Sequence, residues 1–124
     1  MKKEPPKPHH FLLVSCVDKD HIIQYRDIIC IGVSNSQACI YTRTGSKHDA
    51  VIVVCKSLDK LEELLPPEKF YRCHRSWIVH LEYVLHRFRG DNHVIEMFEG
   101  REVPLSREHK DGFLPALELY NSTI

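Results

Sequence analysis

Short apolar runs separated by polar turn residues make up the first half of the chain. The runs are rich in valine, isoleucine and tyrosine, which strands favour, and they are Phe11–Cys16, Ile22–Tyr25, Ile28–Val33, Ala38–Arg43 and Ala50–Cys55. The turn sequences between them are Asp18-Lys19-Asp20, Ser34-Asn35-Ser36 and Thr44-Gly45-Ser46. Because residues of these types form tight turns, the pattern predicts short strands that pair as antiparallel hairpins.

The spacing of apolar residues changes after Cys55. Leucines now recur at intervals of three and four, which places them on one side of a helix, and they are Leu58, Leu61, Leu64 and Leu65. Ser57 can cap the start of this helix, and Pro66-Pro67 ends it. The sequence therefore predicts one main helix at about residues 57–65.

Strand patterns return in the second half of the chain. Tyr83–Phe88 and His93–Phe98 flank the turn residues Gly90-Asp91-Asn92. Glu99-Gly100 then joins the second of these strands to Arg101–Leu105 as a tight hairpin. These runs predict a second group of antiparallel strands.

The segment after Ser106 contains two residues that disfavour a helix. Gly112 and Pro115 stand close together there, and both are unfavourable inside helices. We therefore expect no long regular helix in this segment. The predicted fold class is mostly β, with antiparallel sheets and one main helix.

The charges of the chain balance. There are 17 lysines and arginines against 17 aspartates and glutamates, so the net charge is zero when the nine histidines are neutral. Phosphate binding usually leaves a basic excess, so any DNA contact would depend on a few focused arginines. Histidines could add partial positive charge near neutral pH.

The cysteines are odd in number and include no CxxC pair; they are Cys16, Cys30, Cys39, Cys55 and Cys73. Most lie inside apolar runs, so we expect small buried apolar side chains in a reducing cytosol rather than a disulfide framework. No apolar stretch approaches the roughly 20 residues needed to cross a bilayer. The sequence therefore predicts a cytoplasmic location and no membrane segment.

The histidines do not form a metal-ligand pattern. His74, His80 and His86 are six residues apart, which is no ligand spacing on a helix or a hairpin. Cys73 adjoins His74, but neighbours on a strand point to opposite faces and would not pair as nucleophile and base. With no glycine-rich phosphate loop and no paired carboxylates, the sequence predicts no enzyme, no metal and no cofactor.

Two motifs resemble the signature of LytTR-type DNA-binding domains of bacterial response regulators. Lys69–Leu81 follows the family pattern of an aromatic and a basic residue, then His-Arg-Ser, an aromatic and two aliphatics. Gly100–Arg107 is similar to the family's Gly-x-x-Leu-Pro-Val-Ser-Arg segment. Asp27–Ile31 and Ser57–Leu65 resemble the family's early strand and its helix. The resemblance covers about residues 11–115.

This resemblance implies an elongated arrangement of small antiparallel β-sheets in a domain of about residues 11–118. A proline- and lysine-rich lead-in at 1–10 would precede the domain, and a tail at 119–124 would follow it. Loops, rather than a recognition helix, would enter successive major grooves of double-stranded DNA. Family members usually read imperfect direct repeats in promoters, which calls for a second copy on the DNA, and many follow a receiver domain. We therefore expect a sequence-specific transcriptional regulator of a two-component system.

Four residues are candidates for reading base edges. Arg75 and Arg107, carried over by position, have fork-shaped guanidinium groups suited to guanine. Asn35 and Gln37 stand in a third loop, after the Asp27 strand, and can read adenine. The alternatives are surface ion pairs for the two arginines and ordinary turn roles for Asn35 and Gln37.

Four further residues are candidates for phosphate contact, and they are Lys69, Arg72, His74 and Lys110. For His74 the alternative is a structural bond to nearby backbone. Ser76 can cap the following turn and so hold Arg75 in place. His80 departs from the asparagine usual in the family, and we expect it to hydrogen-bond locally.

A LytTR-like module that binds another protein, with weak or no specific DNA binding, is the alternative function. The neutral net charge favours it. So do the acidic residues near the two motifs, which are Glu82, Glu96, Glu99 and Glu102.

Overall fold

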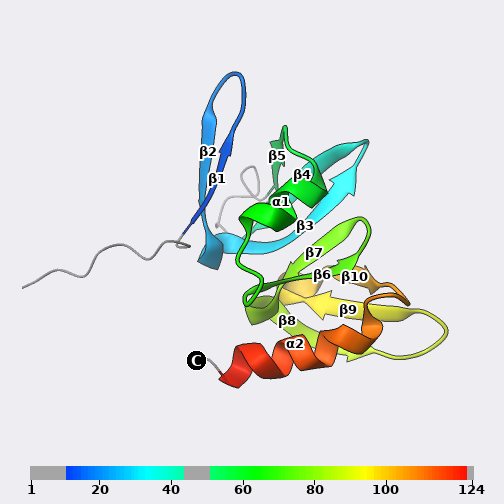
Figure 1. Ribbon diagram of the computed structural model, residues 1–124. Helices are drawn as coiled ribbons and strands as arrows, with labels where there is room; N and C mark the ends of the chain where they lie inside the picture. The colour runs from blue at the N-terminus through cyan, green and yellow to red at the C-terminus, as the bar shows by residue number, and fades with distance from the viewer. Residues whose placement is uncertain (1–10, 44–50, 123–124) are drawn as a thin grey trace, which may run out of the picture.

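The computed structural model describes residues 11–43 and 51–122, and its strands form three antiparallel sheets (Figure 1). The five-stranded sheet has the order β5-β4-β3-β7-β6; the bounds are β3 Ile28–Ser34, β4 Gln37–Thr42, β5 Val51–Val54, β6 Phe70–His74 and β7 Trp77–His80. The two smaller sheets have the orders β1-β2 and β10-β9-β8; the bounds are β1 Phe11–Ser15, β2 Asp20–Gln24, β8 Val84–Phe88, β9 His93–Met97 and β10 Glu102–Leu105.

The predicted β-rich fold is confirmed. The expected lead-in at 1–10 and the turn at 44–46 lie outside the described residues.

The five-stranded sheet is covered on both faces. The β1–β2 hairpin and helix α1 (Leu58–Leu64) pack on one face around Ile31 and Ile78. The three-stranded sheet and helix α2 (Lys110–Ser122) pack on the other face around Cys30 and Val79. The hairpin projects at one end of the molecule and α2 lies at the opposite end (Figure 1), so the arrangement is elongated, as expected.

Helix α1 confirms a helix at about residues 57–65, but the main helix is α2, which has 13 residues against 7 in α1. The side chain of Ser57 accepts a hydrogen bond from the Lys60 N–H at 3.1 Å, as an N-cap does. Leu58 and Leu61 are buried in the core. The cap and the two leucines fix how the polar side of α1 faces the neighbouring strand β6.

The tight hairpin predicted at Glu99-Gly100 is confirmed. Glu99 has φ 72° and Gly100 has φ 83°, and two positive φ angles in a row are what a type I′ turn requires. The Met97 N–H donates to the Arg101 carbonyl oxygen at 2.8 Å. β9 and β10 are therefore joined in a fixed register.

The expectation that no long helix follows Ser106 is wrong. α2 runs through Gly112 and Pro115 and extends to Ser122, into the segment expected to be a tail. A Cβ at Gly112 would lie 2.6 Å from the Tyr71 Oη, so this glycine allows the helix to approach the sheet closely. Pro115 costs one helical hydrogen bond, and the burial of Phe113 against the sheet compensates for that cost. In the part of the chain that the structure describes, neither helix is long and apolar enough to cross a membrane.

Two of the five cysteines also depart from expectation. Cys16 and Cys55 form a disulfide that links the end of β1 to the segment ahead of α1. Cys30, Cys39 and Cys73 are free and buried, as expected. Sequence spacing could not reveal the disulfide, because 39 residues separate its two cysteines and only the docking of the hairpin brings them together.

Truncation of Phe113 tests how far α2 depends on its docking. The side chain is fully buried, so Phe113→Ala should lower the free energy of unfolding by about 3–5 kcal/mol. Leu119→Ala is the matched control on the same helix, because Leu119 is 60% exposed and should change stability by less than about 0.5 kcal/mol. Urea titrations followed by circular dichroism give both values. Equal losses for the two variants would show that α2 is not docked through Phe113.

Candidate functional site

Three turns meet at one end of the five-stranded sheet. The β3–β4 turn lies beside the β6–β7 turn, since the Val33 N–H donates to the Ser76 carbonyl oxygen at 3.0 Å. The segment between β10 and α2 lies on the other side of the β6–β7 turn, because the Ser106 N–H donates to the Cys73 carbonyl oxygen at 2.9 Å. Backbone bonds therefore fix the relative positions of all three turns.

The predicted base-reading arginines lie in two of these turns. Arg75 is in the β6–β7 turn and Arg107 follows β10, and both side chains are exposed. Among the residues that the structure describes, neither guanidinium has an ion pair or a hydrogen bond to the protein. The alternative that these arginines serve in surface ion pairs therefore has no support in the structure.

A cavity of about 510 Å³ lies beside Arg107. His74 and Lys110 line it, so the structure brings these two predicted phosphate contacts close to Arg107. Asp91 and Asn92 of the β8–β9 loop and His93, the first residue of β9, also line the cavity. The sequence indicated a turn and a strand for these residues and no part in binding.

The ring of His74 closes the β6–β7 turn. Its Nδ1 accepts a hydrogen bond from the Ser76 N–H at 3.0 Å, which is the structural backbone bond considered for His74. The turn is thus held by the main chain of Ser76, rather than by the hydroxyl that we expected to act. Burial lowers the pKa of His74, and the positive charges of Arg75, His109 and Arg72 lower it further. A neutral ring keeps Nδ1 as an acceptor and leaves Nε2–H as a donor.

Asn35 and Gln37 stand at the third turn. Asn35 has φ 52° and Ser36 has φ 66°, so the β3–β4 connection is a two-residue turn of the same type as Glu99-Gly100. Asparagine tolerates this backbone better than most residues, which gives Asn35 a role in the turn itself. Asn35 and Gln37 are both exposed, so their side chains remain accessible beside the Arg75 turn.

Lys69 is not brought to this end of the sheet. It precedes Phe70 at the far end of β6, and its Nζ lies 5.8 Å from the centre of the Tyr25 ring. With a rise of roughly 3.3 Å per strand residue, β6 separates Lys69 from Arg75 by more than the reach of one side chain.

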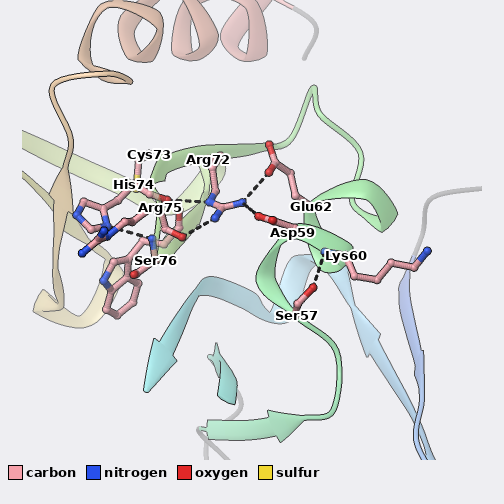
Figure 2. A network of polar contacts seen from close by, with 10 residues as sticks. Ser57, Asp59, Lys60, Glu62, Arg72, Cys73, His74, Arg75 and Ser76 are labelled. Carbon is pink, nitrogen blue, oxygen red and sulfur yellow. Dashed lines mark hydrogen bonds and ion pairs between the residues drawn. The ribbon is translucent and has the colours of Figure 1, made fainter. Parts of the chain in front are cut away.

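Arg72 lies close to the site, but protein groups surround its guanidinium (Figure 2). Its Nε donates to the His74 carbonyl oxygen at 2.8 Å, and a terminal nitrogen donates to the Arg75 carbonyl oxygen. The other terminal nitrogen lies 2.9 Å from Asp59 and 2.7 Å from Glu62. The side chain is only 14% exposed, so the geometry does not offer Arg72 to a phosphate while these contacts hold.

His80 lies at the far end of β7 from the three turns. Its Nδ1 is 2.9 Å from the Ile28 carbonyl oxygen, and its ring stacks on Phe70 with the ring centres 4.4 Å apart. A hydrogen bond was expected here, but its partner lies on β3, 52 residues away in the sequence, rather than nearby in the chain. Burial lowers the pKa of His80, although the bond to Ile28 opposes the shift. The departure from asparagine therefore affects the core rather than the site.

Comparisons with known proteins agree on one family. Residues 18–118 match the profile of the LytTr DNA-binding domain. The sensory transduction protein LytT of Bacillus subtilis (strain 168) is 28% identical over 102 residues, which are 81% of this chain and 40% of that protein. LytT of Bacillus anthracis is 25% identical over 104 residues, 81% of this chain and 39% of that protein. The chain thus spans about two fifths of the length of these relatives.

A solved structure shares the fold. It is a LytTr DNA-binding domain from Bacillus cereus. The TM-score is 0.70 at 20% sequence identity, and the match covers 87% of this chain and 96% of that one. The three sheets and their connections are therefore those of a known domain.

Titration of His74 tests the geometry of the β6–β7 turn. Its pKa in the folded protein should lie below the ordinary value of about 6.5, and Arg75→Ala should raise it by removing a nearby positive charge. Arg26→Ala is the control, because Arg26 is exposed and lies beside the far end of β3. NMR of the imidazole signals measures the pKa of His74 in the unsubstituted protein and in each of the two variants. A pKa at or above 6.5 in the unsubstituted protein would contradict the partly buried, neutral ring.

Proposed function

The chain belongs to the LytTr DNA-binding domain family, and we propose that it binds double-stranded DNA sequence-specifically through the three turns. The observation that carries the proposal is that backbone bonds hold these turns together while Arg75 and Arg107 remain exposed and unpaired within the described residues. Loops fixed in this way can enter a groove without a recognition helix.

Each side chain at this end has a chemistry that suits a part of the duplex. Arg75 and Arg107 can each donate two parallel hydrogen bonds to a guanine edge. Asn35 and Gln37, from the third turn, can pair with an adenine edge.

Two residues are suited to the DNA backbone rather than to the bases. Lys110 and His74 line the cavity beside Arg107, where the lysine ammonium and the imidazole N–H can donate to phosphate oxygens. Contacts of this kind fix the orientation of the protein on the duplex and leave the sequence to be read by the arginines.

The neutral net charge is compatible with this role, because several acids lie away from the three turns. Glu99 is in the β9–β10 turn, at the opposite end of those strands from the β8–β9 loop. Glu96 pairs with His86 at 2.8 Å, and Glu82 accepts a hydrogen bond from Tyr120. With few phosphate contacts, affinity should be modest and should fall as salt increases.

In its biological setting, we propose that the domain is the output module of a cytoplasmic response regulator. It would read direct repeats in promoter DNA, with a second copy on the neighbouring repeat. The names of the LytT relatives, which are sensory transduction proteins, support a link to signalling. The chain spans two fifths of the length of those relatives. The proposal therefore includes a receiver domain as a partner.

A protein-binding role is the second candidate. Phe11, Leu13 and Ile22 are 41%, 49% and 61% exposed on the β1–β2 hairpin, and Leu13 lies opposite Ile22 in the register. An exposed apolar strip of this kind suits contact with another protein. Neither Arg75 nor Arg107 is part of this strip, although Ile22 lines a cavity together with Gln37, so substitutions in the strip can be tested separately from those of the two arginines.

Selection of bound sequences from random duplexes, followed by gel shifts on the selected site, tests the main proposal. Arg75→Ala and Arg107→Ala should each weaken binding by about 1–3 kcal/mol, or roughly 5- to 150-fold, because each loses a base contact. Each should also relax the preference at a different base position. Arg26→Ala, which removes an exposed arginine elsewhere, should bind like the unsubstituted domain.

Two results would count against DNA reading by these turns. If no sequence is enriched over random duplex, the domain is not a specific DNA reader and the protein-binding candidate gains. If enrichment occurs but both arginine variants bind as the unsubstituted domain does, another surface reads the DNA.

A further inference from the structure

The β6–β7 turn begins at an irregular point of the sheet. β6 is an edge strand, and its register with β7 shifts between Arg72 and His74, which leaves Cys73 as an extra residue. A bulge of this kind interrupts the ladder and leaves backbone groups in need of other partners. Carbonyl oxygens next to the turn must therefore find donors outside the strand pair.

Arg72 supplies those donors. Its Nε and one terminal nitrogen reach the carbonyl oxygens of His74 and Arg75 (Figure 2). A guanidinium has five N–H groups in a rigid plane, whereas a lysine ammonium cannot span two such acceptors and two carboxylates at once. The contacts use the shape of the arginine as well as its charge.

Helix α1 supplies the other end of the contact. Asp59 and Glu62 are three residues apart, on one side of the helix, and both approach the same terminal nitrogen of Arg72. α1 is fixed in turn by buried Leu58 and Leu61. The two carboxylates thus orient the guanidinium from an element that is docked into the core.

From this geometry we propose that Arg72, held by Asp59 and Glu62, is a positioning residue that presents Arg75 to DNA. The proposal rests on the proposed function. With the His74 ring bonded to the Ser76 N–H, the main chain of the turn is held on both sides of Arg75. A turn already ordered in the free domain loses less conformational entropy on binding.

Neutralising the two acids separates positioning from simple electrostatics. Asp59→Asn with Glu62→Gln removes two negative charges near the DNA-binding end, which by charge alone should strengthen DNA binding. Positioning predicts weaker specific binding instead, by roughly 3- to 30-fold. Glu63→Gln is the matched control, because Glu63 lies on the same helix and pairs with Lys60; it should bind as tightly as the unsubstituted domain or slightly more tightly.

Substitution of Arg72 itself gives a second, independent readout. If Arg72 positions the turn, Arg72→Gln should weaken binding of the selected DNA but leave the salt dependence unchanged, and Arg72→Lys should not restore affinity. In an Arg75→Ala background, Arg72→Gln should change affinity by less than about twofold, because residues that act through one another are not additive. A phosphate contact would instead reduce the slope of log K against log salt by about 0.9 and would tolerate lysine.

Hydrogen exchange of the free domain separates failure of this proposal from failure of the proposed function. Arg72→Gln should speed exchange of the Ser76 amide and leave exchange of the buried β3 amides unchanged. Unchanged exchange at Ser76, a reduced salt slope, or tighter binding by the double acid variant would each overturn the positioning role. If the unsubstituted domain selects no DNA, the proposed function fails, and the presentation of Arg75 to DNA fails with it.

Discussion

The pairing of β3 with β7 is the contact on which the rest of the structure depends. It joins the hairpins of the first half of the chain to those of the second half, with Ile31 opposite Ile78 and Gly32 opposite Trp77. A Cβ at Gly32 would lie 2.6 Å from the Trp77 ring, so only glycine lets the ring lie across the strand. A slip of one residue would exchange the two faces of the strand, and would disturb both cores and the alignment of the turns at once.

That alignment separates the structural residues of the domain from the exposed ones. Buried side chains lie between the layers, and main-chain bonds hold the turns, so the exposed side chains at the turn tips are the ones available to contact a partner. Three of the acidic residues are either paired or distant from the turn tips. Asp59 and Glu62 are near the tips, but Arg72 engages both of them, and Glu99 is at the far end of its strands. Asp91, in contrast, lines the cavity beside Arg107 and Lys110, so this end carries acidic as well as basic side chains.

Features encoded by neighbouring residues were predictable from the sequence. The strands, the α1 helix and the Glu99-Gly100 turn each follow from spacing over a few positions. Features that depend on tertiary contact were not. α2 persists through Pro115 because Phe113 is buried against the sheet, and Cys16 meets Cys55 only after the hairpin docks. The contacts of Arg72 were not predictable for the same reason, since its acidic partners are 10 and 13 residues away in the sequence.

The contact from Arg72 ends on the carbonyl oxygen of residue 75, an atom that every amino acid possesses. The scaffold therefore recognises the main chain at this position and is indifferent to the side chain. A relative or a designed variant could replace Arg75 with a residue that prefers another base and keep the same support beneath it. Recognition could then diverge by single substitutions at the tip, while the helix, its two acids and Arg72 would have to be inherited as a set.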